Sequence, residues 1–239
     1  MRSSAEADRA EIEKFAGLAE HWWDPAGPLK TLHDINPLRV AYIERHLRAP
    51  LAGARILDVG CGGGILAEAL AARGAAVLGI DLAEQSLAVA RRHAAERDLQ
   101  IDYRAASAAE IATEHPGEFD AVTCLEVLEH VPEPDGVVAA CAAALRPGGV
   151  AFFSTLNRSL KSFLLAIVGA EYVLGMLPRG THEYAKLIRP AELASWCRAA
   201  GLEIVDLTGL RYDPLGREYR LGGDVDVNYF ACARKPRIE

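Results

Sequence analysis

The first residues in this sequence that could do chemistry lie in a glycine-rich turn flanked by two aspartates. Residues 56–64 read ILDVGCGGG, so an apolar run that contains Asp58 leads into glycines interrupted only by Cys61. Asp81 ends the next apolar run. A glycine-rich turn between a strand and a helix is a common site for nucleotide-like ligands. The sequence therefore predicts a binding turn, and the neighbouring acids help to decide the ligand.

Two phosphate-binding interpretations of this turn can be compared with its residues. A P-loop needs GxxxxGK[ST], and neither lysine nor a hydroxyl residue follows these glycines at that spacing. A dinucleotide site is harder to dismiss, because Gly62, Gly64 and Ala67 match G-x-G-x-x-A and Asp81 is placed like a ribose-binding acid. Asp58 argues against it, since a carboxylate just before the turn would repel a pyrophosphate and attract a cationic amino group.

A second group of ionisable residues lies in the segment LEVLEHV. Glu126, Glu129 and His130 are spaced i, i+3 and i+4, so a helical turn would place all three on one side. Two carboxylates and an imidazole could hold a divalent ion such as Mg²⁺, or His130 alone could act as a general base. A third interpretation is that the segment only shapes a cleft and caps the following helix.

The elements that must position these residues alternate along the chain. Short apolar or β-branched runs are separated by helix-length segments, which is typical of a parallel sheet with helices on both faces. We therefore predict an α/β fold with a doubly wound, mostly parallel, seven-stranded sheet, in which the last two strands form an antiparallel pair. The predicted strands are 54–59, 75–80, 101–105, 119–125, 149–155, 202–210 and 225–234.

Two helices are predicted before the first strand. Residues 10–23 show apolar positions at helical spacing, and residues 37–47 form a second helix with Asn36 as its N-cap and Pro37 in its first turn. Arg39 is a lone cation on the apolar face of this helix, and solvation is the alternative to a binding role. Trp22, Trp23 and His33 belong to the same cover, in which we expect a collective lid role.

Composition restricts the class of partner. The 239 residues carry a net charge of -7, and the basic residues are scattered, which excludes a general nucleic-acid binder. The five cysteines are widely spaced and lie mostly in apolar runs, as expected of reduced thiols in a cytoplasmic protein. The first fifteen residues are charged and lack the apolar core of a signal peptide, so export is not expected.

The strand, Asp58 and the glycines together resemble motif I of class I S-adenosylmethionine-dependent methyltransferases. The resemblance implies S-adenosylmethionine as cofactor, with the glycines against its methionine tail, Arg39 at its carboxylate and Asp81 at its ribose. A helix N-cap is the alternative for Asp81, and a surface acid is the alternative for Asp58. The segment YRAASAAEI lacks the carboxylate that many relatives use at the adenine, which leaves Ser107 or backbone groups. The implied cofactor-binding residues are Arg39, Asp58, Gly60, Cys61, Gly62, Gly64, Asp81, Leu82, Ser107 and Leu125.

Signatures outside the cofactor motifs resemble a narrower family, the ubiquinone-biosynthesis O-methyltransferases. WWD, INPLR, GTHEY and DVNY carry this resemblance, which covers residues 11–235. It implies methylation of polyprenylated phenols, namely 2-polyprenyl-6-hydroxyphenol and 3-demethylubiquinol, and contact with other enzymes of that pathway. A phenol with a pKa of about 10 must lose its proton, so His130 and Glu129 become the candidate catalytic residues. Glu126, Glu129 and His130 are the candidate metal ligands.

A long insertion follows the fifth predicted strand. Within residues 156–189 lies SFLLAIVGAEYVLGMLP, which is shorter than the roughly 20 apolar residues of a membrane-spanning helix and is flanked by basic residues. We expect it to cover the cleft and to contact membrane lipid peripherally at the inner face, and a buried or dimerising helix is the alternative.

The chain is thus expected to form a single methyltransferase domain over residues 1–239. The rival functions are a class I methyltransferase that acts on another small phenolic acceptor, a nicotinamide-dependent dehydrogenase, and a non-catalytic assembly member that binds prenyl quinones. The expected parts are an N-terminal helical cover at 10–48, a cofactor-binding core at 54–155, the lid or membrane-contact insertion at 156–189, and a C-terminal helix and strand pair at 190–235.

Overall fold

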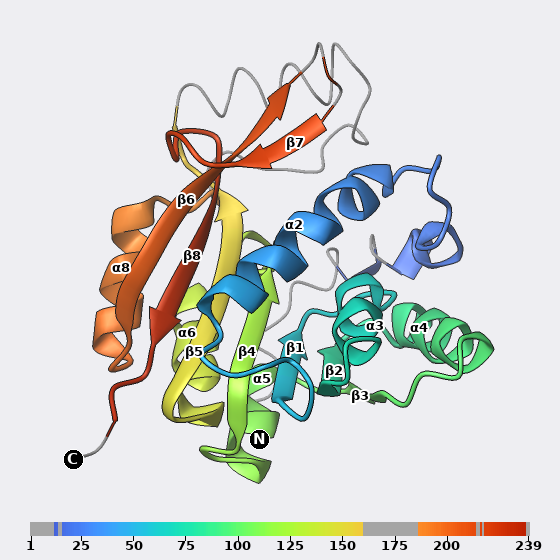
Figure 1. Ribbon diagram of the computed structural model, residues 1–239, viewed down its shortest axis with the longest axis horizontal. Coiled ribbons are helices and arrows are strands. Elements are labelled where there is room, and N and C mark those ends of the chain that lie inside the picture. Colours follow the sequence, from blue (N-terminus) through green and yellow to red (C-terminus); the bar gives the residue numbers. More distant parts are fainter. Residues whose placement is uncertain (1–11, 14–15, 160–185, 214–215, 217, 238–239) are drawn as a thin grey trace.

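A single mixed sheet organises the molecule in the computed structural model, which describes residues 12–13, 16–159, 186–213, 216 and 218–237. Within these residues the sheet has eight strands in the order β3-β2-β1-β4-β5-β8-β6-β7 (Figure 1). The first five strands in that order run parallel, and β8, β6 and β7 pair antiparallel. The strands are β1 Arg55–Val59, β2 Ala76–Asp81, β3 Asp102–Ala105, β4 Phe119–Leu125, β5 Leu145–Leu156, β6 Glu203–Asp213, β7 Glu218–Leu221 and β8 Asn228–Arg234.

The predicted α/β fold and its mostly parallel sheet are confirmed, with one strand more than expected. Each of the seven predicted ranges coincides with a strand, and the last two form the predicted antiparallel pair. The additional strand, β7, reads EYRL and pairs with the end of β6. Its alternation of exposed and half-buried residues has no apolar run, so the sequence offered little sign of it.

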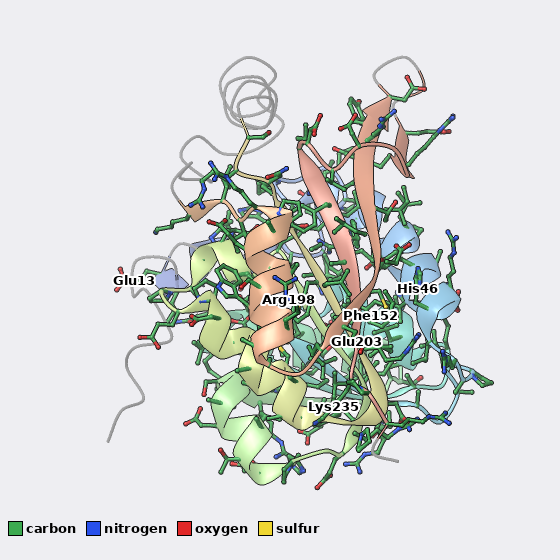
Figure 2. All side chains as sticks on the ribbon, turned by 90° about the vertical axis from the view of Figure 1, so that its left-hand side faces the viewer. Glu13, His46, Phe152, Arg198, Glu203 and Lys235 are labelled. Atoms are coloured by element: carbon green, nitrogen blue, oxygen red, sulfur yellow. The ribbon has the colours of Figure 1, made fainter. Side chains whose placement is uncertain are left out.

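Helices cover both faces of the sheet, as a doubly wound fold requires. Adjacent residues of β5 show the alternation: Phe152 packs with Tyr42 and Ile43 on one face, and Phe153 packs with Val138 and Cys141 on the other. In Figure 2 Phe152 lies inside the molecule. The first face carries α2 Lys30–His46, α3 Ile65–Ala71 and α4 Glu84–Glu96, and the second carries α5 Ala108–Glu114, α6 Pro134–Ala144 and α8 Pro190–Ala199.

The N-terminal cover differs from the prediction. Helix α2 begins at Lys30 instead of Pro37, so Pro37 lies inside the helix and Asn36 is not its N-cap. A proline in a helix removes one backbone hydrogen bond, which tertiary packing can offset. Asn36 instead donates from Nδ2 to the carbonyl of Ile65 at 3.1 Å, which ties α2 to the start of α3. Part of the predicted helix at 10–23 lies outside the described residues, and its last turn is the 3₁₀ helix η1, Ala19–His21.

The topology determines where a ligand can bind. Strands β1, β2 and β4 are parallel, so the ends marked by Val59, Asp81 and Leu125 lie at one edge of the sheet. The chain order reverses between β1 and β4, and such a switch point opens a crevice at the carboxyl ends of the strands. The predicted cofactor residues therefore converge on this edge.

Ser107 begins α5 with a reciprocal capping box. Its Oγ accepts from the Glu110 backbone N–H at 3.2 Å, and Glu110 Oε2 accepts from the Ser107 backbone N–H at 2.8 Å. Removing such a cap leaves a helix N–H without its partner.

We predict that Ser107→Ala lowers the free energy of unfolding by about 1 kcal/mol. Urea unfolding measures this change. Thr113→Ala, at an exposed position of the same helix, is the matched control and should change stability by less. Equal effects of the two substitutions would contradict the capping role.

Candidate functional site

The glycine turn is held against the end of β2 by its own backbone. The N–H groups of Gly60 and Cys61 both donate to the carbonyl of Ile80, at 2.8 and 2.9 Å. Gly60 has a φ of 70°, and a Cβ there would lie 2.3 Å from Cγ2 of Val127. Only glycine fits this position, because both the backbone conformation and the contact exclude a side chain.

Asp81, at the end of β2, accepts hydrogen bonds that fix the same turn. Its Oδ2 accepts from the Gly62 N–H at 2.9 Å, and its Oδ1 accepts from the Ala83 N–H at 2.8 Å. Burial raises the pKa of Asp81, and these backbone N–H groups partly offset that rise. Asp81 supports the turn before α4, although the N-cap of that helix is Ala83. Each oxygen keeps a second lone pair, so ribose binding by Asp81 stays a prediction.

Asp58 is a buried carboxylate, not the surface acid that was its alternative. Its exposed fraction is 3%, and Thr123 Oγ1 donates to its Oδ1 at 2.6 Å. Burial raises the pKa of Asp58 from 3.8 to about 6, against the lowering effects of Thr123 and Arg39. Its Oδ2 is buried without a hydrogen-bond partner. An unpartnered buried oxygen of this kind is suited to a ligand that donates.

Arg39 lies buried among acids, which excludes the solvated alternative. Its exposed fraction is 6%, and its Nε and Nη2 are buried without hydrogen-bond partners. Burial lowers the pKa of Arg39, and the charges of Glu126, Asp58 and Glu129 raise it in turn. The guanidinium thus lies near three carboxyl groups and keeps two nitrogen donors, Nε and Nη2, for an anion.

The backbone that carries Glu126, Glu129 and His130 does not form the expected helical turn. Glu126 has a φ of 56°, in the left-handed region, and precedes the 3₁₀ helix η2, Leu128–His130. Ser154 Oγ donates to Glu126 Oε1 at 2.7 Å, and Thr155 Oγ1 donates to Glu129 Oε2 at 2.8 Å. Residues 126, 129 and 130 therefore do not share one side of a helix, because no helical turn spans them.

Glu129 is the most perturbed acid of this group. Its exposed fraction is 3%, and burial, followed by the charge of Glu126, raises its pKa well above the usual value. Its Oε1 has no hydrogen-bond partner. A carboxyl in this environment binds a proton at a pH where an ordinary glutamate is ionised.

The predicted three-residue metal site is not supported by the described residues. They contain no group of three or more His, Cys, Asp or Glu side chains that could hold a metal ion, and Glu126, Glu129 and His130 are all among them. The reason is the left-handed backbone at Glu126, which takes the place of a helical turn.

The remaining predicted residues lie around the turn. Leu82 follows Asp81 and is 40% exposed, and Leu125 is half-buried at the end of β4. Cys61 is buried, and burial raises the pKa of its thiol well above the usual value. Gly64 has a φ of 87° and is the N-cap of α3. Ser107 uses its hydroxyl in the capping box, where it also donates to Glu110 Oε2 at 2.8 Å, so an adenine contact by that hydroxyl would compete with the cap.

Two tryptophans lie directly on the glycine turn, which sequence reasoning assigned only to a general cover. A Cβ on Gly62 would lie 2.3 Å from the Trp22 ring, and Trp22 Nε1 donates to Ser86 Oγ at 3.2 Å. Trp23 Nε1 donates to the carbonyl of Gly63 at 2.9 Å. These glycines are therefore needed for the approach of Trp22 as well as for the turn itself.

Trp23 also stacks on a histidine that contacts a buried glutamate, an arrangement that the sequence did not suggest. Its ring stacks on His93 with a centroid distance of 3.5 Å and an interplanar angle of 7°. His93 Nδ1 lies 2.8 Å from Oε1 of Glu68, a buried acid in the otherwise apolar helix α3. In the sequence, the sign of this contact was Glu68, an acid among apolar residues. Thr123, Ser154 and Thr155 are likewise polar residues in apolar strands, and each contacts an acid of the site.

Comparisons with known proteins agree with the fold. Residues 32–207 match a family model described as a methyltransferase domain. A magnesium protoporphyrin IX methyltransferase from Synechocystis PCC 6803, solved with bound SAM, superposes with a TM-score of 0.64 at 19% identity, over 96% of this chain and 98% of that chain. A 1,6-didemethyltoxoflavin-N1-methyltransferase from Burkholderia thailandensis gives a TM-score of 0.64 at 19% identity, over 94% and 87% of the two chains.

Curated relatives are much more similar in sequence. A protein of Thiobacillus denitrificans is 60% identical over 228 residues, which cover 95% of this chain and 97% of the relative. A protein of Azotobacter vinelandii is 60% identical over 93% of this chain and 95% of the relative. One from Pseudomonas aeruginosa PAO1 is 55% identical over 95% and 97%. All three are named ubiquinone biosynthesis O-methyltransferase.

Asp58 is predicted to destabilise the ligand-free protein. Its folded pKa of about 6 exceeds the ordinary 3.8, so the folded state binds more protons than the unfolded chain between these values, and stability falls as the pH rises through that window. Asp58→Asn should therefore raise the free energy of unfolding by about 2–3 kcal/mol at pH 7.5, and by about half as much at pH 5.

Urea unfolding at the two pH values measures this difference. Glu203→Gln removes an exposed carboxylate and is the control, with a change near zero at both pH values. A destabilised Asp58→Asn variant at pH 7.5 would contradict the prediction.

Proposed function

Because the chain belongs to the ubiquinone biosynthesis O-methyltransferases, we propose that it methylates phenolic hydroxyls of polyprenylated acceptors with S-adenosylmethionine as methyl donor. The proposed acceptors are 2-polyprenyl-6-hydroxyphenol and 3-demethylubiquinol. One observation carries the cofactor assignment: a buried cation and a buried anion, Arg39 and Asp58, both have unpartnered hydrogen-bonding atoms beside the glycine turn.

The unpartnered atoms are complementary to an amino-acid zwitterion. Arg39 offers Nε and Nη2 to a carboxylate, and Asp58 offers Oδ2 to an ammonium group. A pyrophosphate would leave Asp58 buried beside a like charge, which is unfavourable. The methionine tail of S-adenosylmethionine satisfies both residues, so the donor set fits this cofactor and disfavours the dinucleotide of the rival dehydrogenase.

The other predicted residues suit the rest of the cofactor. We propose that Gly60, Cys61, Gly62 and Gly64 pack against the methionine tail and that Asp81 accepts from the ribose hydroxyls. Leu82 is an exposed apolar side chain directly after Asp81, and with Leu125 it would provide an apolar surface for the adenosine. The adenine amino group is left to Ser107 or to backbone groups.

Proton acceptance is the main chemical task of the protein side chains. When bound, S-adenosylmethionine supplies a methyl group that is already electrophilic. The acceptor hydroxyl must be aligned with the methyl group and must lose its proton to a base within hydrogen-bonding reach. Glu129 is buried with its Oε1 unpartnered, and His130 follows it in η2. We assign the proton to one of these two residues.

We propose separately that a divalent cation such as Mg²⁺ binds here, with fewer protein ligands than the three that the sequence indicated. Glu126 lies close enough to Glu129 to raise its pKa, and Glu129 Oε1 is unpartnered, so two carboxylates suit a hard cation. Such an ion would favour the phenolate form of a catechol. The described residues do not add His130 to this pair as a third ligand.

The domain organisation also belongs to the proposal. We treat residues 1–239 as one methyltransferase domain, in which 10–48 cover the cofactor and 156–189 form a lid that contacts membrane lipid. Other ubiquinone-pathway enzymes are the proposed protein partners, and the proposed location is cytoplasmic, on the inner face of the membrane. None of the described helices is long and apolar enough to cross a bilayer.

Methyl transfer to a short-prenyl demethylubiquinol analogue tests the proposed function. We expect label to pass from tritiated S-adenosylmethionine to the analogue, and we expect Asp81→Ala to lose both cofactor binding and transfer. Absence of turnover under any condition, or binding of NADH in place of S-adenosylmethionine, would refute the assignment. The same assay with EDTA tests the cation alone, since unchanged turnover refutes only the metal.

Lipid contact is tested separately by deleting residues 160–178, which lie outside the described residues. We predict that the full chain co-sediments with anionic liposomes and that the deletion variant stays in the supernatant. Retained binding of S-adenosylhomocysteine shows that the variant is folded. Equal co-sedimentation of the two proteins would contradict the proposed lipid contact.

A further inference from the structure

A cavity of about 390 Å³ lies beside the turn that carries the candidate base. Leu128 and His130, the first and last residues of η2, both line it, and Glu129 stands between them in the chain. The cavity therefore reaches His130, one of the two candidate bases, and lies next to the other along the chain. Arg39, Asp58 and Asp81 are absent from its lining, so it is separate from the proposed cofactor residues.

Seven of the eleven residues that line the cavity are apolar, and they come from separate parts of the chain. Leu128 and Val131 approach from η2 and the segment after it, Ile188 approaches from the segment before α8, and Trp196 contributes an indole from α8. Side chains of this kind bind hydrocarbon, because contact with hydrocarbon removes their surface from water.

The acidic residue of the lining does not provide a free charge. Glu192 pairs with Arg158, and its Oε2 also accepts from the Arg189 backbone N–H at 2.8 Å. A carboxylate neutralised in this way is a poor partner for a cationic ligand. Besides this acid, the lining includes the basic residues Arg158 and Lys186 and the imidazole of His130, and its remaining residues form the apolar wall.

We propose that this cavity holds the prenyl units nearest the ring of the methyl acceptor. The inference rests on the proposed function, in which the acceptor has a polar ring and an isoprenoid hydrocarbon substituent. The ring needs polar partners and must lie near Glu129 or His130, whereas the substituent needs an apolar wall. A volume of about 390 Å³ is within the range of small-ligand sites, so the cavity encloses only the first part of a long chain.

The proposal predicts how the enzyme discriminates between acceptors. A geranyl-substituted catechol should bind at least about tenfold more tightly than catechol itself, since each buried methylene is favourable. Extending the chain from two prenyl units to four should add less than the first two units did. Chain length should act mainly on KM, because the prenyl units lie away from the reacting hydroxyl.

Two substitutions that change the cavity in opposite ways test the assignment. Trp196→Ala removes an apolar wall, and Val131→Phe fills the space. Both should lower kcat/KM for the geranyl acceptor by about tenfold while changing the value for catechol by less than about twofold. Ser195→Ala, at the exposed position next to Trp196 on α8, is the matched control and should leave both values unchanged.

Calorimetric binding of both acceptors to the protein saturated with S-adenosylhomocysteine distinguishes a failure of the cavity assignment from a failure of the proposed function. If the wild-type protein prefers the geranyl acceptor and both cavity variants lose that preference, the assignment is supported. If the variants weaken both acceptors equally, or change neither, the cavity does not hold the chain. A wild-type protein that binds with the predicted preference but transfers no methyl group would refute the proposed function and leave the cavity assignment supported.

Discussion

The site depends on one constraint, which is the burial of opposite charges at the carboxyl edge of the sheet. Asp58 and Glu129 are acids that burial drives toward the protonated form, and Arg39 is a base whose pKa burial lowers. Each charge is tolerated because the others are near, although their hydrogen bonds are incomplete. Such an arrangement is expensive for folding alone. The proposed cofactor, which carries both charges, would complete these hydrogen bonds and offset that cost.

The surrounding structure limits how these charges can rearrange. Thr123 holds Asp58 from the neighbouring strand, and Asp81 holds the Gly62 N–H, so the turn is fixed to both adjacent strands. Trp23 closes the turn from outside through the carbonyl of Gly63 and its stack on His93. The N-terminal residues and the sheet therefore contact opposite parts of the glycine turn. These contacts fix the turn and leave the unpartnered atoms of Arg39 and Asp58 available for a ligand.

Local pattern was sufficient to predict the sheet and the residues of the turn, because strand periodicity and glycine requirements act over a few neighbours. Asp58, Gly60 and Asp81 were found in this way. The contacts of Trp23 with His93, and of His93 with Glu68, were not found, since they join positions far apart in the sequence. The start of α2 was misplaced for another reason: Pro37 usually marks a first helical turn, but here packing retains it inside the helix. Strand β7 was missed because its residues follow no apolar pattern.

The turn after β4 shows how a small change of backbone alters chemistry. An α-helical turn would have placed Glu126, Glu129 and His130 together, as a metal site requires. With Glu126 in the left-handed region and η2 at about three residues per turn, successive side chains point in different directions. Glu129 is thereby bound to Thr155 in the interior, while Leu128 and His130 reach the cavity. In the proposed function, this short turn would join recognition of the acceptor to removal of its proton, because its neighbouring residues face two adjacent spaces.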